Sequence, residues 1–151
     1  MSLQQEVELL RNIPLFAKID PSKLKLLAFT SQRLTFAAGD TVFEQGDAGD
    51  AAYIIIGGEA DVIVDTPGGP LVVATLKQNE VVGEIAILCD VPRTATVRAK
   101  VQMTTLRISK ELFFSLVVEF PEIAVEIMRE LAHRLEQTTE RLREAVARSQ
   151  S

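Results

Sequence analysis

The sequence predicts a mainly β fold of the sandwich or barrel type with helices at both ends, an α+β chain. Between residues 33 and 109, short β-type runs alternate with turn residues, and helical periodicity precedes and follows them. The runs lie too close together for crossover helices, which excludes a parallel βαβ arrangement. We expect one domain over 1–151, with a helical lead-in at 1–30, a barrel at 31–109 and C-terminal helices at 110–151.

Two helices are predicted in the lead-in. Apolar residues recur at helical spacing from Leu3 to Leu10, which indicates a first amphipathic helix. Asp20 and Pro21 then supply an N-cap and a first-turn proline for a second helix over Ser22 to Phe29.

The barrel is predicted from seven β-type runs. They are Arg33 to Phe36, Thr41 to Glu44, Ala52 to Ile56, Glu59 to Val64, Leu71 to Leu76, Ala95 to Ala99 and Thr104 to Ile108. The runs are separated by glycines that stand next to an acidic residue, another glycine or a proline, a composition typical of tight turns. These turns are Gly39-Asp40, Gly46-Asp47, Gly57-Gly58 and the run from Pro67 to Pro70.

Two more helices are predicted after the barrel. Ser109 is a suitable N-cap for a helix over Lys110 to Val118, and Phe120-Pro121 interrupts the helical pattern. From Glu122 to about Ala147 a longer helix follows, whose apolar positions alternate by fours and threes. They are Ala124, Met128, Leu131, Leu135, Leu142 and Ala145, with Thr138 in phase between Leu135 and Leu142.

Such a heptad seam packs against another helix or against the chain's own barrel. Its length favours a second helix, so we expect a homodimer through the C-terminal helix.

The segment at 82–97 carries the chemistry. Gly83 can adopt a positive φ and turn the chain into a short helix over Glu84 to Leu88. The free N–H groups of Ile85 and Ala86 at the start of that helix form a natural anion site, and the small Ala86 side chain leaves them accessible.

Three side chains complete this segment. Arg93 supplies a planar cation that pairs bidentately with phosphate, and Thr94 adds a hydroxyl donor. An ionised Glu84 only accepts hydrogen bonds, so it suits a sugar hydroxyl. We interpret the segment as a cradle for a sugar phosphate; the alternative is a strand-turn-strand connection in which Glu84 and Arg93 form an ion pair.

The run from Gly83 to Val97, G-E-I-A-I-L-x3-P-R-T-A-T-V, resembles the phosphate-binding cassette of cyclic-nucleotide-binding domains. The turns at 39–40 and 46 and the strand from Tyr53 to Glu59 are similar to that family as well, although Asn79 stands where many members have glycine. The resemblance implies a jelly-roll β-barrel that binds cAMP or cGMP. It implies that Glu84 holds the ribose 2′-hydroxyl, Arg93 holds the cyclic phosphate, and Gly83, Ile85, Ala86 and Thr94 complete the cradle.

The stretch from Ala132 to Glu140 resembles the dimer helix of catabolite-activator-like members. The resemblance implies that Thr138 meets the adenine amino group and that Thr139 meets the nucleotide of the partner subunit. The alternative is that Thr138 only sets helix register. Thr94 occupies a position where threonine in relatives contacts guanine, so cAMP is favoured over cGMP only on the basis of Thr138.

Composition excludes several other classes of partner. The formal charge is −5 and no Lys/Arg-rich stretch is present, which argues against direct binding of nucleic acid. No apolar run approaches a membrane span and no signal peptide is recognisable, so we expect a cytoplasmic chain. The single cysteine, Cys89, cannot form an internal disulfide; we expect it to be a small half-buried residue, with a redox-sensitive thiol as the alternative.

We expect no catalysis and no metal. The chain has no P-loop and no G-x-S-x-G elbow, and its one histidine, His133, falls off the seam on a solvated face. The expected function is a regulatory sensor whose C-terminal helices move when nucleotide binds. The alternative is a dimerisation or interaction domain that no longer binds nucleotide. Members that bind DNA carry a helix-turn-helix after the long helix, and this sequence ends at Ser151, so we expect a stand-alone receptor or the sensor of a longer protein with its own output domain.

Overall fold

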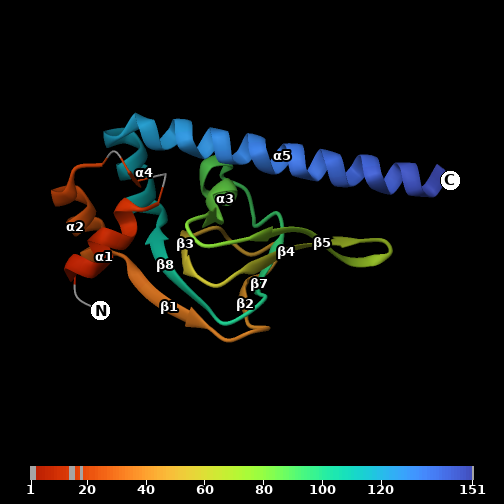
Figure 1. The fold of residues 1–151 in the computed structure, drawn as a ribbon, viewed down its shortest axis with the longest axis horizontal. Helices are drawn as coiled ribbons and strands as arrows, with labels where there is room; N and C mark the ends of the chain where they lie inside the picture. Colours follow the sequence, from red (N-terminus) through yellow and green to blue (C-terminus); the bar gives the residue numbers. More distant parts are fainter. Residues whose placement is uncertain (1–2, 14–15, 18, 151) are drawn as a thin grey trace.

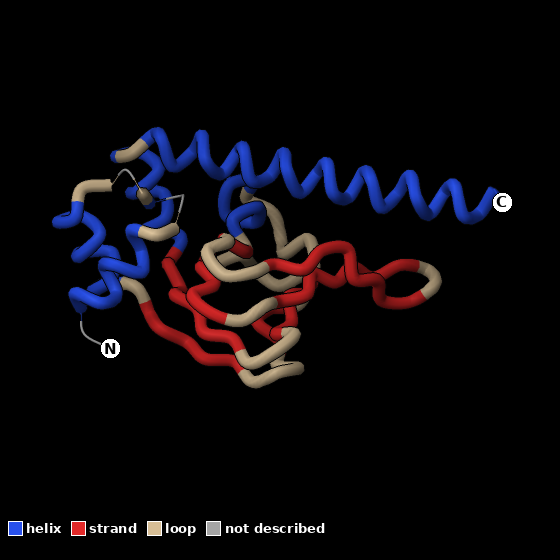
Figure 2. Tube along the Cα trace, in the orientation of Figure 1, coloured by secondary structure: helices blue, strands red, loops and turns tan. Residues whose placement is uncertain are grey.

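The chain is described by a computed structural model over residues 3–13, 16–17 and 19–150, except for the side chains of Ile85 and Gln150. Two antiparallel sheets of four strands form the centre, with helices before and after them (Figure 1, Figure 2). This arrangement confirms the predicted jelly-roll barrel with flanking helices. Within the helical lead-in, residues 14–15 and 18 lie outside the described residues.

The N-terminal helices are α1 (Leu3–Arg11) and α2 (Pro21–Thr30). The carboxylate of Asp20 accepts a hydrogen bond of 3.1 Å from the backbone N–H of Ser22, and Pro21 occupies the first turn. The predicted cap therefore starts α2 as expected.

Each sheet has an order that mixes distant parts of the sequence. The first sheet runs β1 (Gln32–Phe36), β8 (Met103–Ser109), β3 (Ala51–Gly57), β6 (Val81–Val82). The second sheet runs β2 (Thr41–Phe43), β7 (Thr96–Ala99), β4 (Ala60–Thr66), β5 (Gly69–Leu76). The seven predicted runs are all strands, and no predicted end differs from the observed one by more than two residues.

The strand β6 was not predicted, because two residues are too few to show an alternating pattern. It pairs with Tyr53 and Ile54 of β3. The turn before it contains Asn79 at φ 73°, whose N–H donates a 2.7 Å hydrogen bond to the carbonyl of Ile55. Asparagine is one of the few residues other than glycine that adopt this left-handed conformation readily, so the turn forms.

Two hydrophobic clusters hold the fold together. One lies between the helices and the first sheet and includes Leu24, Ile54, Ile87 and Ile123. The other lies inside the barrel, where the inward side chains of both sheets meet. Because Ile87 belongs to the first cluster, the short helix of the cassette is anchored by its buried face.

The C-terminal helices are α4 (Lys110–Glu119) and α5 (Pro121–Gln150). The hydroxyl of Ser109 caps α4 by accepting from the N–H of Leu112 at 3.2 Å, and Phe120 ends it. In Figure 1, α5 passes over α3 (Glu84–Cys89) and continues far beyond the barrel. Within the described residues, no helix is both long enough and apolar enough to cross a bilayer.

The two faces of α5 differ in exposure. Ile123 and Ile127 are buried against the domain. The seam residues Met128, Leu135 and Leu142 are 59%, 67% and 64% exposed. These three residues therefore lie on a helix face that the chain itself does not cover, whereas Leu131 of the predicted seam packs against the cluster between the helices and the first sheet.

Candidate functional site

The cassette begins with a sharp turn at Gly83. This residue has φ +90° and stands immediately before α3. A Cβ at this position would lie 2.6 Å from Nη1 of Arg93 and 3.3 Å from the carbonyl oxygen of Ala51. Glycine is required here for two reasons: its left-handed backbone and the close approach of the arginine.

Arg93 is held from three sides. Its Nη1 donates to the carbonyl of Gly83 at 2.8 Å, and its Nη2 donates to the carbonyl of Ala51 at 2.7 Å. The guanidinium carbon lies 4.0 Å from the centre of the Phe43 ring, a cation–π contact. Asp50 provides a more distant ion pair at 3.7 Å. These contacts orient a guanidinium that is only 3% exposed.

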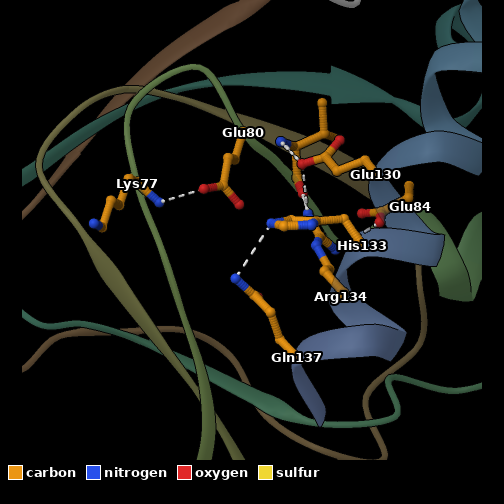
Figure 3. Close-up of polar contacts among 8 residues, drawn as sticks. Lys77, Glu80, Glu84, Glu130, His133, Arg134 and Gln137 are labelled. Atoms are coloured by element: carbon orange, nitrogen blue, oxygen red, sulfur yellow. Dashed lines mark hydrogen bonds and ion pairs between the residues drawn. The ribbon is translucent and has the colours of Figure 1, made fainter. Parts of the chain in front are cut away.

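Glu84, the first residue of α3, is also buried. Its Oε1 accepts a 2.8 Å hydrogen bond from Nη1 of Arg134 on α5. Nη2 of Arg134 donates at 2.9 Å to Glu130 and also donates to the carbonyl of Val81 (Figure 3). Arg134 thus joins the C-terminal helix to the cassette and to β6.

Burial sets the electrostatics of these groups. It raises the pKa of the Glu84 carboxyl, and the charge of Arg134 opposes this rise. It raises the pKa of Glu130 as well, again opposed by Arg134. Burial lowers the pKa of the Arg93 guanidinium, which the negative charge of Asp50 partly offsets. The cassette therefore concentrates charged groups where water does not solvate them.

A small cavity of about 60 Å³ lies between these residues. Its wall includes Phe43, Gly83, Glu84, Ala86, Arg93, Thr94 and Arg134, with apolar residues of the barrel behind them. In the described part of the chain, three buried side-chain atoms have no hydrogen-bond partner, and all three belong to residues that line this cavity. They are Oε2 of Glu84, Nε of Arg93 and Nε of Arg134.

The three unpartnered atoms offer one acceptor and two donors. A buried polar atom without a partner is costly, and native proteins keep few of them. The set fits a ligand that has both a hydroxyl group and an anionic oxygen, because a hydroxyl donates to a carboxylate and an anion accepts from guanidinium N–H groups.

Most of the predicted site residues come together here. Gly83, Glu84, Ala86, Arg93 and Thr94 line the cavity, and Thr94 is exposed. Ile85 is the second residue of α3, between Glu84 and Ala86.

Thr138 and Thr139 lie elsewhere on α5. Thr138 is exposed, and its hydroxyl donates a 2.9 Å hydrogen bond to the carbonyl of Arg134 in the preceding turn. Thr139 lies beside Leu135 and Arg143 in a separate surface groove. In this conformation neither threonine belongs to the wall of the cavity.

Sequence reasoning missed two residues of the site. Arg134 stood inside the stretch that resembles the dimer helix, but no pattern indicated that it would contact a residue 50 positions earlier. Phe43 reads as one more apolar strand residue, and only the packing of β2 brings its ring beneath Arg93. The alternative interpretation predicted an ion pair between Glu84 and Arg93. In the structure, Glu84 pairs with Arg134, and Arg93 pairs with Asp50.

The expectation for Cys89 is wrong. The residue is exposed at the end of α3. A helix this short buries one face only, and Ala86 and Ile87 occupy that face. His133 is exposed, as predicted, and contacts Gln137 at 3.3 Å. Within the described ranges, His, Cys, Asp and Glu side chains form no group of three that suits a metal ion.

Comparison with known proteins gives the family. The family model described as "Cyclic nucleotide-binding domain" matches residues 33–120, which include the barrel and the cassette. The chain is 34% identical over 115 residues, 76% of its length, to a cAMP-dependent protein kinase regulatory subunit from Blastocladiella emersonii. It is 29% identical over 140 residues, 92% of its length, to a CRP-like cAMP-activated global transcriptional regulator from Mycobacterium tuberculosis.

The chain spans only 28% and 62% of the length of these two relatives. Among solved structures, the regulatory domain of Toxoplasma gondii PKA with cAMP superimposes with a TM-score of 0.75 at 22% identity, over 85% of this chain and 50% of that one. This similarity supports the fold. Together with the family match across the barrel and the cassette geometry, it leads to one conclusion: the chain belongs to the cyclic nucleotide-binding domain family.

Proposed function

We propose that this domain is a regulatory sensor that binds a cyclic nucleotide, with cAMP favoured over cGMP, and that it performs no catalysis. One observation carries the proposal: Glu84, Arg93 and Arg134 line one cavity, and each has a buried polar atom without a hydrogen-bond partner. A cyclic nucleotide has the matching groups, a ribose hydroxyl for Glu84 and a phosphate monoanion for Arg93. The residues present therefore fit this ligand.

The residue roles follow from these contacts. Glu84 accepts the ribose hydroxyl on Oε2, since Oε1 is already bonded to Arg134. Arg93 binds the phosphate through its remaining N–H groups, while the carbonyls of Gly83 and Ala51 hold the guanidinium in place. Gly83, the backbone N–H groups of Ile85 and Ala86, and the hydroxyl of Thr94 complete the cradle.

Binding is proposed to move the C-terminal helices. A cavity of about 60 Å³ is far smaller than the roughly 300 Å³ at the lower end of ordinary ligand pockets. The wall that can move is α5, which reaches the cavity through the single side chain of Arg134 and is separated from α4 by Phe120. Because a ligand shifts an equilibrium only by its differential affinity for two states, the new contacts must favour the displaced position of α5. Charge-assisted hydrogen bonds of roughly 1.5 to 3 kcal/mol each are sufficient for such a shift.

Base recognition requires a repositioning of α5 as well. Thr138 lies one turn beyond Arg134 on α5, and the proposed contact with adenine requires that part of the helix to approach the cavity. Thr94 already lines the cavity and is the residue that would favour guanine. The preference for cAMP therefore rests on Thr138 and on the cAMP named for the kinase and transcriptional relatives.

A homodimer through α5 is part of the proposal. The exposed seam residues Met128, Leu135 and Leu142 support it, because a helix with such a seam is stabilised by a second helix. In that dimer, Thr139 would lie close to the nucleotide of the partner subunit. We also propose a cytoplasmic location and control of an output domain in a longer chain, by analogy with the relatives.

Calorimetric titration with cAMP, cGMP and linear 5′-AMP tests the proposal. We expect both cyclic nucleotides to bind, cAMP more tightly, and 5′-AMP to bind much more weakly, because its phosphate carries a second charge. Heat or displacement that stays undetectable at high micromolar cyclic nucleotide would leave the alternative, a dimerisation domain that retains the barrel only. Equal affinities for the two cyclic nucleotides would remove the preference for cAMP and the role of Thr138.

A further inference from the structure

One guanidinium on α5 serves two carboxylates. Nη1 of Arg134 donates to Oε1 of Glu84 at 2.8 Å, and Nη2 donates to Oε1 of Glu130 at 2.9 Å (Figure 3). The side chains of Glu84 and Glu130 are 2% and 24% exposed. Two negative charges and one positive charge therefore share a site with little access to water.

Glu130 is also fixed to the barrel. Its Oε1 accepts a hydrogen bond of 3.4 Å from the backbone N–H of Val81, the residue whose carbonyl accepts from Nη2 of Arg134. Glu130 and Val81 thus hold one end of the guanidinium, which leaves the other end directed at Glu84 in the cavity. Glu130 itself does not line that cavity. It lines a neighbouring groove of about 710 Å³.

Other charged groups surround this cluster. The turn before β6 contributes Lys77 and Glu80, and α5 contributes Glu126, Arg129 and His133, all of which line the same groove. On the other side of Glu84 lies Arg93, whose positive charge favours the ionised carboxyl. Glu126 is paired with Arg129 at 2.7 Å and does not take part in the contacts of Arg134.

Sharing the guanidinium weakens its effect on each carboxyl. Burial is the main cause that raises the pKa of Glu130, Arg134 opposes it, and the charges of Glu84 and Glu80 raise it further. The interaction between two charges is mutual, so while both carboxyls are ionised each disfavours the charge of the other. The acceptor strength of Glu84 then depends on whether Glu130 carries its charge.

We propose that Glu130 is a positioning residue that shares Arg134 with Glu84 and thereby sets the acid end of the pH range in which the cavity accepts a nucleotide. The inference rests on the proposed function, since it assigns a regulation to the same site. As the pH falls, Glu84 takes up a proton and loses its role as a pure acceptor of the ribose hydroxyl. The charge on Glu130 makes this happen at a higher pH than Arg134 alone would permit.

The variant Glu130→Gln isolates the charge from the hydrogen bonds. The amide oxygen still accepts from Arg134 and from the N–H of Val81, so the helix keeps its contacts with the barrel. Glu126→Gln removes the same charge one turn earlier on α5, and His133→Asn removes the histidine of the groove. These two variants are the matched controls.

Two measurements on the whole chain give independent results. The first is the titration of the Glu84 side-chain carboxyl carbon by ¹³C NMR without nucleotide. We expect its midpoint to fall by about one pH unit in Glu130→Gln and to stay unchanged in both controls. The second is the dissociation constant for cAMP between pH 4.5 and 8. One pH unit below the wild-type midpoint, Glu130→Gln should bind about fivefold more tightly than the wild type, with equal affinities at pH 8.

A Glu84 midpoint that is unmoved or raised in Glu130→Gln would overturn the inference, as would an equal shift in Glu126→Gln. The first measurement does not need the ligand. If the wild type binds no cyclic nucleotide at any pH, the proposed function and the consequence for binding both fail. If it binds but the variant leaves the midpoint in place, only the role of Glu130 fails.

Discussion

Nη1 of Arg134 donates a hydrogen bond of 2.8 Å to Oε1 of Glu84, although the two residues are 50 positions apart. This contact links the first residue of α3 to the middle of α5. It is a direct polar connection between the cassette and the helix that carries the exposed seam, and it makes the cavity sensitive to the position of that helix.

Replacing Arg134 tests this link. In Arg134→Gln the Glu84 carboxyl loses the charge that opposes burial, so its pKa should rise and cAMP affinity should fall about tenfold, the effect of one charge-assisted hydrogen bond. Hydrogen exchange should become faster in the first half of α5, since its tie to the barrel is removed. Arg129→Gln is the control, because Arg129 is 72% exposed and its ion pair is with Glu126 on the same helix. Unchanged exchange and affinity in Arg134→Gln would show that the contact couples nothing.

Alanine substitutions at Gly83 and Gly39 separate the effect of backbone strain from the effect of a steric clash with Arg93. In Gly83→Ala the new Cβ meets Arg93, Phe43 and the carbonyl of Ala51, so the arginine must move and cAMP binding should be lost. Gly39→Ala is matched in backbone conformation, with φ +91°, but has open space around its Cβ. We expect a loss of about 1 kcal/mol in unfolding free energy from strain in both, and normal binding only in Gly39→Ala. Denaturant unfolding and calorimetry measure the two effects, and normal binding by Gly83→Ala would contradict this geometry.

The two carbonyl contacts of Arg93 require a planar fork. Arg93→Lys keeps the charge but cannot bond to both Gly83 and Ala51 while facing a phosphate, so cAMP affinity should fall at least a hundredfold. Arg98→Lys, on the exposed face of β7, should bind as the wild type does. Calorimetric titration measures the affinity for cAMP. A loss of affinity below threefold in Arg93→Lys would mean that a positive charge alone is sufficient to bind the phosphate.

Glu84 makes stability depend on pH. Its folded-state pKa is raised, so the folded chain holds that proton more tightly than the unfolded chain. The resulting stabilisation is complete below about pH 4.3, the unfolded value, and is lost as the pH rises through the folded pKa. At pH 8 the buried charge opposes folding, and Glu84→Gln should melt at the wild-type temperature or a few degrees higher while losing cAMP binding.

At pH 4 that advantage of Glu84→Gln should disappear, because the wild-type carboxyl is then protonated. Thermal melts at the two pH values check this, with Glu136→Gln as an exposed control on α5. If Glu84→Gln melts more than about 5 °C below the wild type at pH 8, the ion pair with Arg134 stabilises the fold by more than the burial of the Glu84 charge destabilises it.

The seam on α5 predicts the oligomeric state. Leu142→Asp places a charge on the exposed seam and should convert a dimer to a monomer in sedimentation equilibrium. Ala147→Asp adds the same charge about 140° around the helix and should leave the dimer intact. A wild type that is monomeric at all concentrations would exclude the proposed dimer.

Much of the fold could be predicted from the sequence because its signals are local. Turn glycines and alternating apolar residues indicated the strands, and the caps at Asp20 and Ser109 placed two helix starts. The break at Phe120 and the positive φ at Gly83 depend on residues within one or two positions, so they too were predictable. β6 was not, since its two residues are a strand only because β3 pairs with them.

For the site, the chemical groups of the cassette could be predicted from the sequence alone: a glycine turn, a carboxylate, a guanidinium and a hydroxyl between Gly83 and Thr94. The partners of these groups depend on tertiary packing. Arg134 reaches Glu84 because α5 packs across α3, and Phe43 lies beneath Arg93 because β2 pairs with β7. Local conformation follows from neighbouring residues, whereas a contact across 50 positions depends on how whole elements bury their apolar faces.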